Sequence, residues 1–402
     1  MTGSVEMTTP LIRRVNLSKV LAVLSAAAGA MTGTDVMAAT GLTRATVHAV
    51  CNDLIRLGWV RELEAKRENG NQLGRPSRWF EFDERAGFVL GVDIGAHSST
   101  LLLADLRGAT LAVERLPIDA TASFVEHGLG VQRAARQAAA TAHVDVDDIL
   151  AIAMGFAARV DRSGTIASED PYSQATYEAR RAALTELTGA TVLAENDANL
   201  AAVGERWQGV AQGVDDLAVL LTGERMGAGL IESGRLLRGS QGGAGEMAFL
   251  DRVEGVGNAD GIALLARSWA ADALAHQTET AIRELAAGTP EGVTAEMVFD
   301  AAALGDPVAQ GILDRLATRL ARVVATVATI FNPDLVVIAG AVSRSAGVLL
   351  DAIDDQLPSL TVTPPRVALS TLGEGIVSVG AVKHALDFVH HNALDIDVAR
   401  AG

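Results

Sequence analysis

The sequence predicts an α/β protein with a small N-terminal head and a larger two-lobed body, and three features of the chain support this prediction. Residues 1–85 carry slightly more Lys and Arg than Asp and Glu, whereas the remainder is acidic enough to bring the formal net charge to −16. In the body, short apolar runs typical of buried strands alternate with helical patterns, as in α/β folds. A Gly-rich stretch, Thr222–Phe249, follows one of these runs, where a chain often turns tightly or approaches a phosphate.

Length and composition limit the classes of protein to which the chain can belong. Its 402 residues suffice for two or three domains with a substantial core. The single Cys51 excludes a disulfide framework and a Cys-rich zinc site within one chain. No apolar run reaches the roughly 18 residues that a membrane-spanning helix needs. We therefore expect a cytoplasmic protein that does not enter a membrane.

An apolar stretch near the N-terminus imitates a signal peptide but is better explained as a helix. Arg13 and Arg14 precede Val20–Ala30, as the basic residues of a signal peptide would. The apolar residues nevertheless recur with the helical spacing i, i+3, i+4, i+7. They are Leu17, Val20, Leu21 and Leu24.

The head reads as three helices. The first is expected over Leu17–Ala28 and a short second one over Gly33–Ala39. Gly41 then occupies the usual glycine position after a helix, and Thr43 is a good N-cap for a third helix, Arg44–Leu57. A short helix, a Gly turn and a capped helix together indicate a helix-turn-helix.

The third helix would enter the major groove of double-stranded DNA with its N-terminal residues at the base edges. Arg44 could bind guanine or a phosphate, Ala45 could contact a thymine methyl, and the hydroxyl or imidazole groups could bond bases or backbone. The candidate DNA contacts on this helix are Thr43, Arg44, Ala45, Thr46 and His48. The alternative is a three-helix bundle without a DNA role.

A wing is predicted after the third helix. Trp59–Glu64 and Arg78–Phe82 alternate like the strands of a hairpin, with the polar loop Lys66–Ser77 between them. The loop holds Gly74-Arg75-Pro76, a stiff turn whose arginine suits a narrow minor groove. The alternative for Arg75 is a solvated loop cation. We add Gly74, Arg75 and Pro76 to the candidate DNA contacts.

The body contains two similar series of elements. Buried strands are expected at Phe88–Ile94, Thr100–Asp105, Ile149–Phe156 and Thr191–Ala194, followed by a helix through Glu205. A hairpin around residues 217–238 begins the second series. It continues with the largely helical Met297–Ile330, the strand Leu335–Ile338 and a closing helix, Val377–Val389. We expect a head at 1–85 and a body at 86–402, with one lobe of about 86–200 plus 377–390 and a second of about 201–376.

Five motifs of the body resemble those of the ROK (repressor, open reading frame, kinase) family. In chain order they are Leu90–Gly95, Glu195–Asn199, Gly227–Gly229, Gly245-Glu246 and Asn332–Ser343. The resemblance covers nearly the whole chain, and the head is similar to that of the regulator branch. It implies an actin-like, sugar-kinase-like body that binds a sugar or sugar derivative. The implied ligand contacts are Asn196, Asp197 and Glu246, with Asp197 at the position of the kinases' general base.

The chain departs from the family pattern in both phosphate loops. The Gly-Gly-Thr-Lys-like turn is here Gly95–Ser98, and the Gly-Thr-Gly of the second loop is Gly223-Glu224-Arg225. A carboxylate where a phosphate should approach is unfavourable, and a side chain in place of Gly blocks close backbone approach. We therefore expect no kinase activity, no catalytic residue and no nucleotide cofactor.

The family's structural zinc site is also altered. Phe249 stands where the family has a zinc-binding His, and no Cys follows it, so we expect no metal. That His and a nearby Glu, here Ala263, also contact the family's sugars. With Ala157-Ala158 in place of the expected Pro-Gly, three sugar-contacting positions have changed. A different effector, weak sugar sensing and no effector at all remain open.

Together these features predict a DNA-binding transcriptional regulator, a repressor in carbohydrate metabolism, without kinase activity. It would bind a palindromic operator as a homodimer or dimer of dimers. Two alternatives stay open: an ATP-dependent sugar kinase with an accessory DNA-binding head, and a regulator that works without an effector.

Overall fold

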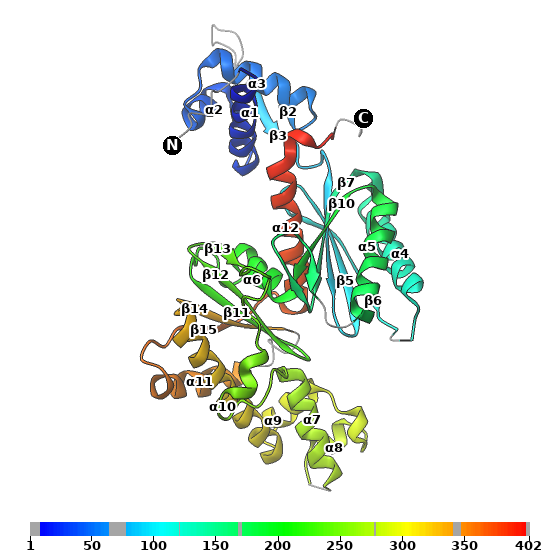
Figure 1. Cartoon of the computed structure of the whole chain (residues 1–402), viewed down its shortest axis with the longest axis vertical. Helices are drawn as coiled ribbons and strands as arrows, with labels where there is room; N and C mark the ends of the chain where they lie inside the picture. The colour runs from blue at the N-terminus through cyan, green and yellow to red at the C-terminus, as the bar shows by residue number, and fades with distance from the viewer. Residues whose placement is uncertain are drawn as a thin grey trace, which may run out of the picture.

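The computed structural model describes residues 9–63, 78–119, 121–167, 171–276, 279–340 and 347–398. In Figure 1 the head lies at one end of an elongated molecule, a first sheet with helix α12 lies in the middle, and a second sheet with its helices lies at the other end. The mixed α/β architecture with a separate N-terminal head is as predicted.

The head is a winged helix-turn-helix. Its helices are α1 (Thr9–Ala26), α2 (Gly33–Thr40) and α3 (Arg44–Arg56), and its three-stranded sheet has the order β1-β3-β2. The strands are β1 (Met31–Thr32), β2 (Val60–Leu63) and β3 (Trp79–Phe82), and both pairs are antiparallel. Residues 64–77, which include the predicted contacts Gly74, Arg75 and Pro76, lie outside the described residues.

The local chemistry of the head follows the sequence. Gly41 ends α2 with a left-handed φ of 68°, a conformation that glycine adopts without strain. Thr43 caps α3, as predicted. The first helix, however, begins at Thr9 rather than at Leu17. Its additional turns are held by the ion pairs Arg13–Asp53 and Arg14–Asp395, whereas the apolar spacing marks only the part of the helix that packs inward.

The body consists of two sheets with the same topology. The first has the order β10-β7-β4-β5-β6 and the second the order β13-β12-β11-β14-β15. Each consists of an antiparallel three-stranded meander to which two parallel strands are added. The first sheet contains β4 (Phe88–Ile94), β5 (Ser98–Asp105), β6 (Thr110–Pro117), β7 (Ile149–Phe156) and β10 (Thr191–Asn196). The second contains β11 (Leu217–Thr222), β12 (Met226–Glu232), β13 (Arg235–Leu237), β14 (Leu335–Ala339) and β15 (Arg366–Leu369).

Helices cover both sheets. Figure 1 shows α4 (Phe124–Ala142) and α5 (Pro171–Thr188) on one side of the first sheet and α12 (Ile376–Asn392) on the other. Helix α6 (Asp197–Gln208) packs against α12 and against strands of the second sheet. The outer helices of the second sheet are α7 (Ile262–Ala275), α8 (Ile282–Leu285), α9 (Ala295–Ala303), α10 (Pro307–Phe331) and α11 (Gly347–Leu360).

The stretch Met297–Ile330 is largely helical, as predicted, and is divided between α9 and α10. Gly305 adopts a φ of 86°, and the Asp306 side chain caps α10 by accepting a hydrogen bond from the Ala309 N–H at 2.8 Å. Pro307 then occupies the first helical turn, where its missing N–H costs nothing. These three residues separate α9 from α10.

Helix α12 lies so close to its neighbours that glycine is needed at the contacts. A Cβ atom on Gly380 would lie 1.8 Å from the Leu200 carbonyl oxygen of α6. A Cβ on Gly91 of β4 would lie 2.4 Å from the Ser378 carbonyl oxygen of α12. Because backbone meets backbone at both places, α12 has little freedom to slide against α6 or the first sheet.

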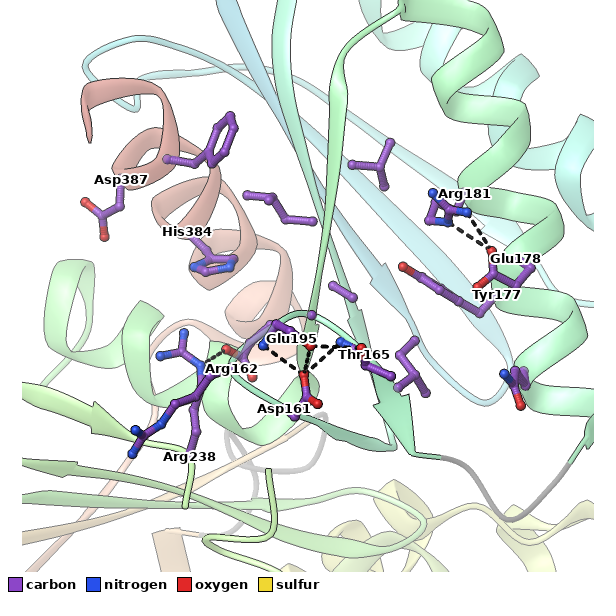
Figure 2. A pocket seen from close by; sticks show the side chains of 18 of the residues that line it. Asp161, Arg162, Thr165, Tyr177, Glu178, Arg181, Glu195, Arg238, His384 and Asp387 are labelled. Carbon is purple, nitrogen blue, oxygen red and sulfur yellow. Dashed lines mark hydrogen bonds and ion pairs between the residues drawn. The ribbon is translucent and has the colours of Figure 1, made fainter. Parts of the chain in front are cut away.

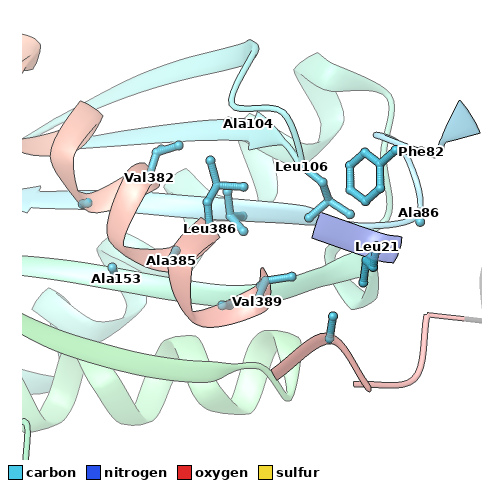
Figure 3. Packing of buried hydrophobic residues seen from close by; sticks show 14 of the residues in the cluster. Leu21, Phe82, Ala86, Ala104, Leu106, Ala153, Val382, Ala385, Leu386 and Val389 are labelled. Carbon is cyan, nitrogen blue, oxygen red and sulfur yellow. The ribbon is translucent and has the colours of Figure 1, made fainter. Parts of the chain in front are cut away.

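The head rests on the C-terminal part of α12. Figure 3 shows Leu21 and Phe82 of the head packed with Leu106, Leu386 and Val389 of the body. These side chains belong to one hydrophobic cluster that continues through α12 and α6 to the facing sides of both sheets. The head and the first sheet are therefore joined by a shared core.

Polar contacts reinforce this junction. Arg107, in the turn after β5, donates hydrogen bonds to the carbonyls of Ser25 and Ala27 at 3.1 and 2.7 Å. These groups lie at the C-terminus of α1, where helix carbonyls lack partners and a cation is favourable. The same guanidinium lies 5.5 Å from the centroid of the Phe82 ring, which also meets the ring of His390.

Candidate functional site

The start of α3 presents one cation to solvent. The Thr43 hydroxyl accepts a hydrogen bond from the Thr46 N–H at 3.3 Å, and the two hydroxyl oxygens are 2.9 Å apart. Both threonines thus serve the helix cap. Arg44 and Ala45 are exposed in the first turn, and no described residue forms a hydrogen bond or ion pair with the Arg44 side chain. Of the predicted contacts on this helix, these two are the most available to DNA.

His48 has a packing role as well. Its imidazole is half-buried and meets the Phe80 ring edge to face, with centroids 6.1 Å apart. A Cβ on Gly33 would lie 3.5 Å from the His48 imidazole, so this histidine fills the space between α2 and the wing strand β3. A base contact by His48 stays a prediction.

Arg78 links the wing to the recognition helix, which was not predicted from the sequence. It donates to Asn52 Oδ1 on α3 at 2.8 Å and to Glu62 Oε1 on β2 at 2.6 Å. Its guanidinium also lies 5.1 Å from the centroid of the Phe80 ring. These contacts fix the hairpin relative to α3. The opposite charges of Arg78 and Glu62 on the two predicted hairpin strands could have indicated their pairing. The bond from Arg78 to Asn52 could not have been predicted without knowing how the hairpin packs on α3.

Two of the predicted ligand contacts, Asn196 and Asp197, lie where β10 ends and α6 begins. Asn196 is the N-cap of α6: its Oδ1 accepts from the Asn199 N–H at 3.0 Å, and its Nδ2 donates to the Ala158 carbonyl at 3.1 Å. Asp197 Oδ1 accepts from the Ala198 N–H at 2.8 Å. The amide of Asn196 is therefore already engaged at both ends by the protein, which leaves less of it for a ligand.

Three carboxylates interact at this point. Burial raises the pKa of Asp93, at the end of β4, to about 7, and the nearby Asp197 adds to the effect. Burial likewise raises the pKa of Asp197 to about 6, with a further contribution from Glu246 and against hydrogen bonds that favour its ionised form. Asp197 is thus close enough to Glu246 and Asp93 for their charges to interact, and the carboxyl of Asp93 can carry a proton near neutral pH. Binding of a ligand by Asn196, Asp197 and Glu246 stays a prediction.

The turn between β11 and β12 is closed by a charge pair. Both terminal nitrogens of Arg267, from α7, donate to the Glu224 carboxylate at 2.9 and 2.7 Å. His97, from the turn between β4 and β5, places Nε2 3.7 Å from Glu224 Oε1. The hydrogen bonds from Arg267, with a smaller effect of His97, hold the pKa of Glu224 below its ordinary value. Glu224 is therefore an anion that connects the turns of the two sheets.

The glycines after this turn are explained by packing. A Cβ on Gly229 would lie 2.1 Å from the Ala198 carbonyl oxygen, so β12 could not approach α6 with any other residue there. Gly245 adopts a φ of 84°, and its Cβ would lie 1.9 Å from the Ala228 carbonyl oxygen. These positions require glycine whether or not a phosphate binds.

Comparison with known proteins decides the family. A family model described as "ROK family" matches residues 89–382, and one described as "IclR helix-turn-helix domain" matches residues 15–64. The protein belongs to the ROK family. Among its relatives, a glucokinase of Thermotoga maritima is 33% identical over 217 residues, covering 49% of this chain and 67% of the relative. The DNA-binding transcriptional dual regulator NagC of Escherichia coli is 26% identical over 319 residues, covering 78% and 77%.

A solved structure shares the fold of this ROK protein. The crystal structure of a ROK family transcriptional regulator, a homologue of the Escherichia coli Mlc protein, matches with a TM-score of 0.70 at 20% identity. It covers 93% of this chain and 96% of the other, a share that the body alone could not supply. Among the described residues, no helix is both long and apolar enough to cross a membrane.

The zinc site expected of a ROK protein does not fit the residues present. Among the described residues, no group of three or more His, Cys, Asp or Glu side chains is arranged to hold a metal. The loop of residues 253–260, which follows Phe249, is held instead by arginines of α10. The buried Arg319 donates to the carbonyls of Val256 and Asn258 at 2.9 and 2.6 Å, and Arg322 donates to that of Glu254 at 2.6 Å.

This loop in turn supports the Glu224 turn. The Gly261 N–H donates to the Glu224 carbonyl at 2.9 Å, and the Met226 N–H donates to the Ala259 carbonyl at 2.7 Å. A third backbone bond joins the Ala263 N–H to the carbonyl of the residue before Glu224 at 3.2 Å. In this ROK protein the loop and the Glu224 turn are thus one hydrogen-bonded unit.

Proposed function

We propose that this ROK protein is a cytoplasmic, DNA-binding transcriptional repressor that responds to a small molecule and does not transfer phosphate. The winged helix-turn-helix head, with Arg44 exposed at the start of α3, carries the proposal. An acidic body repels the DNA backbone, so only a head of this kind can approach it. The relatives that combine a head with a ROK body support the same function.

The turn between β11 and β12 argues against kinase activity. Phosphoryl transfer depends mainly on positioning and neutralising the phosphates. Here the Glu224 carboxylate stands where the family has the middle residue of Gly-Thr-Gly, and Arg267 already binds it in bidentate fashion. A nucleotide would have to break this pair and would then face an anion, which is costly in a cleft of low dielectric.

Effector binding near Asn196, Asp197 and Glu246 would act on the head through α12. A ligand shifts the protein between two states only if its affinities for them differ. Closure of the lobes around a ligand satisfies this condition, because the contacts come from both sheets. Since the head shares a hydrophobic core with α12, a movement of the first sheet would carry the head with it. In a homodimer this movement changes the spacing of two heads on a palindromic operator.

Mapping of the DNA bound by the protein across its genome tests the DNA-binding function directly. We expect a small number of palindromic sites, and the genes beside them would indicate the effector. Only diffuse, salt-sensitive binding without preferred sites would contradict a sequence-specific regulator. A thermal-shift screen of sugars and phosphosugars distinguishes a ligand-responsive protein from one that ignores effectors, because a bound ligand raises the stability of the native state.

One observation favours the alternative of a sugar kinase with an accessory head. Asp197 retains the position of the kinases' general base, and its pKa of about 6 is close to that needed for proton abstraction near neutral pH. A coupled ATPase assay with common hexoses and amino sugars decides between the two functions. Turnover that disappears in Asp197→Asn would establish the kinase; we expect none.

A further inference from the structure

A cavity lies beside the sheet edge formed by β10. It has a volume of about 660 Å³, which suits a small ligand. Its walls come from α12, α5 and the short hairpin of β8 (Arg159–Val160) and β9 (Ile166–Ala167). It is separate from the predicted contacts Asn196, Asp197 and Glu246, none of which lines it.

The carboxylates in the wall of this cavity already have partners. Each accepts at least one hydrogen bond or ion pair from the protein, so none needs a ligand to be satisfied. The buried Glu195, for example, accepts from Arg238 Nε at 2.6 Å and from Asn199 Nδ2 at 2.9 Å. The four pairings are Glu195 with Arg238, Asp161 with Ser163 and Thr165, Glu178 with Arg181, and Asp387 with Lys383.

The donors in the same wall are less well satisfied. No described residue hydrogen-bonds the side chain of Arg162 or His384, and Arg238 uses only its Nε, so that both terminal nitrogens are free. Figure 2 shows these three side chains with Glu195 on the α12 side of the cavity, whereas Tyr177 and Arg181 lie on the α5 side. The wall holds four carboxylates and three arginines, so its charges nearly balance. Its preference for a ligand is therefore set by the unused donors.

We propose that this cavity binds a small polyhydroxylated anion, a sugar acid or a sugar phosphate, whose charged group is held by Arg162, Arg238 and His384. Guanidinium groups match the geometry of carboxylates and phosphates and can hold them with two hydrogen bonds. Leu193 and Phe388 supply apolar surface for the carbon skeleton. The remaining polar groups in the wall, such as those of Gln174 and Asn392, can bond hydroxyls.

The position of the cavity makes such a ligand an effector. Arg238 follows strand β13 of the second sheet, whereas Arg162 and His384 belong to elements packed on the first. An anion bound by all three would therefore stabilise one arrangement of the sheets. His384 lies on α12, which carries His390 against Phe82 of the head less than two turns further along. This role rests on the proposed function of the protein as a regulator.

Isothermal titration calorimetry on the full-length protein tests the proposal with four probes: gluconate, glucose 6-phosphate, glucose and inorganic phosphate. We expect gluconate or glucose 6-phosphate to bind at millimolar concentration or below and to bind more tightly than either glucose or phosphate alone. The better of the two anions identifies the charged group as carboxylate or phosphate. Binding of neither sugar anion, or equal binding of glucose, would overturn the proposal.

Two variants and a control place the binding in this cavity. Arg162→Ala removes an exposed donor, and Arg238→Lys keeps a cation beside the buried Glu195 but removes the guanidinium fork. Each should lower the affinity for the sugar anion by about tenfold or more, as expected for the loss of a charged hydrogen bond. Arg181→Ala, on the opposite wall and paired with Glu178, should bind as the wild type does.

If Arg162→Ala and Arg181→Ala bind alike, the ligand lies elsewhere. DNA binding measured on the same preparations separates this inference from the proposed function. Site-specific DNA binding without any anion binding would remove only the inference, whereas loss of both would remove the regulator as well.

Discussion

Arg267 holds both oxygens of the Glu224 carboxylate, at 2.9 and 2.7 Å, in the turn where a ROK kinase would receive phosphate. The pair is half-buried, and His97 approaches the same carboxylate from the turn of the other sheet. A contact of this kind contributes little to stability when it is open to solvent. Under the proposed function its consequence is functional, because it would fill the position of a phosphate with a protein anion and the cation that neutralises it.

We predict that the wild-type protein does not bind MgATP and that the double variant Glu224→Thr, Arg225→Gly binds it measurably. The variant restores the Gly-Thr-Gly of the family, removes the carboxylate and frees the Arg267 guanidinium for a phosphate. Calorimetric titration with MgATP measures both proteins. Arg225→Gly alone, which keeps Glu224, should remain without binding. Micromolar affinity of the wild type for MgATP would show that the charge pair does not exclude nucleotide.

The arginines of α10 lead to a second prediction, on the loop of residues 253–260. Arg319→Met should lower the free energy of unfolding by roughly 2–4 kcal/mol, because the carbonyls of Val256 and Asn258 lose a charged donor in a buried site. Hydrogen exchange should become faster in residues 253–260 and also in the attached Glu224 turn. Arg322→Met, which removes one bond from a more exposed side chain, is the matched control and should have a smaller effect.

The same loop should be indifferent to metal. Added EDTA or zinc should leave the thermal midpoint of the wild type unchanged, since Arg319 and Arg322 hold the backbone of this loop by hydrogen bonds. Stoichiometric zinc in the purified protein, or a midpoint that falls with EDTA, would mean that a metal contributes to the fold. Unchanged exchange in Arg319→Met would mean that the arginine does not hold the loop.

Continuous apolar runs gave the most accurate sequence predictions. Phe88–Ile94 and Ile149–Phe156 were predicted to the residue, because these central strands are apolar apart from Asp93 and end at turns. Strand β6, Thr110–Pro117, was not predicted: it lies at the sheet edge, and every side chain except that of Ala112 is exposed or partly exposed, which weakens the apolar pattern. Helix α4 escaped prediction as well, since its buried side includes small residues such as Gly128 and Ala135.

The candidate sites were predictable only where function depends on local sequence. Thr43 correctly indicated the start of the recognition helix, because an N-cap side chain bonds a backbone N–H only three residues away. The bond between Arg267 and Glu224 joins residues 43 positions apart, and that between Arg319 and Val256 joins residues 63 apart. Such pairs depend on how helices pack on the second sheet, which periodicity does not reveal.

The DNA-binding role of the head gives a further prediction. Arg44→Ala should weaken operator binding by about 1–3 kcal/mol, the usual range for one specific arginine contact. Arg56→Ala is a suitable control, because Arg56 lies at the other end of α3 and pairs with Asp53. Electrophoretic mobility shifts with a mapped operator measure both. Equal affinities for the two variants would remove Arg44 from the interface. The same assay tests Arg75, which lies outside the described residues.

The cleft carboxylates give a last prediction, on pH. The pKa of Asp93 in the folded protein is raised to about 7 from an ordinary value of about 4. Between these two values the folded state binds more protons than the unfolded state, so the contribution of Asp93 to stability is present below about pH 4 and is lost as the pH rises through about 7. Asp93→Asn mimics the protonated carboxyl at every pH. It should therefore raise the thermal midpoint at pH 8, by an amount corresponding to roughly 1–2 kcal/mol after allowance for solvent in the cleft.

At pH 5 Asp93 is protonated in the folded wild type and ionised only in the unfolded state, so the variant should gain clearly less than at pH 8. Thermal melts at both values measure the difference, and Asp300→Asn, an exposed carboxylate on α9, is the control for removing one negative charge from an acidic protein. If Asp300→Asn stabilises the protein at pH 8 as much as Asp93→Asn does, the effect comes from net charge and not from the cleft. If neither variant changes the shift of the thermal midpoint between pH 5 and pH 8, the Asp93 carboxyl is not held protonated by its surroundings.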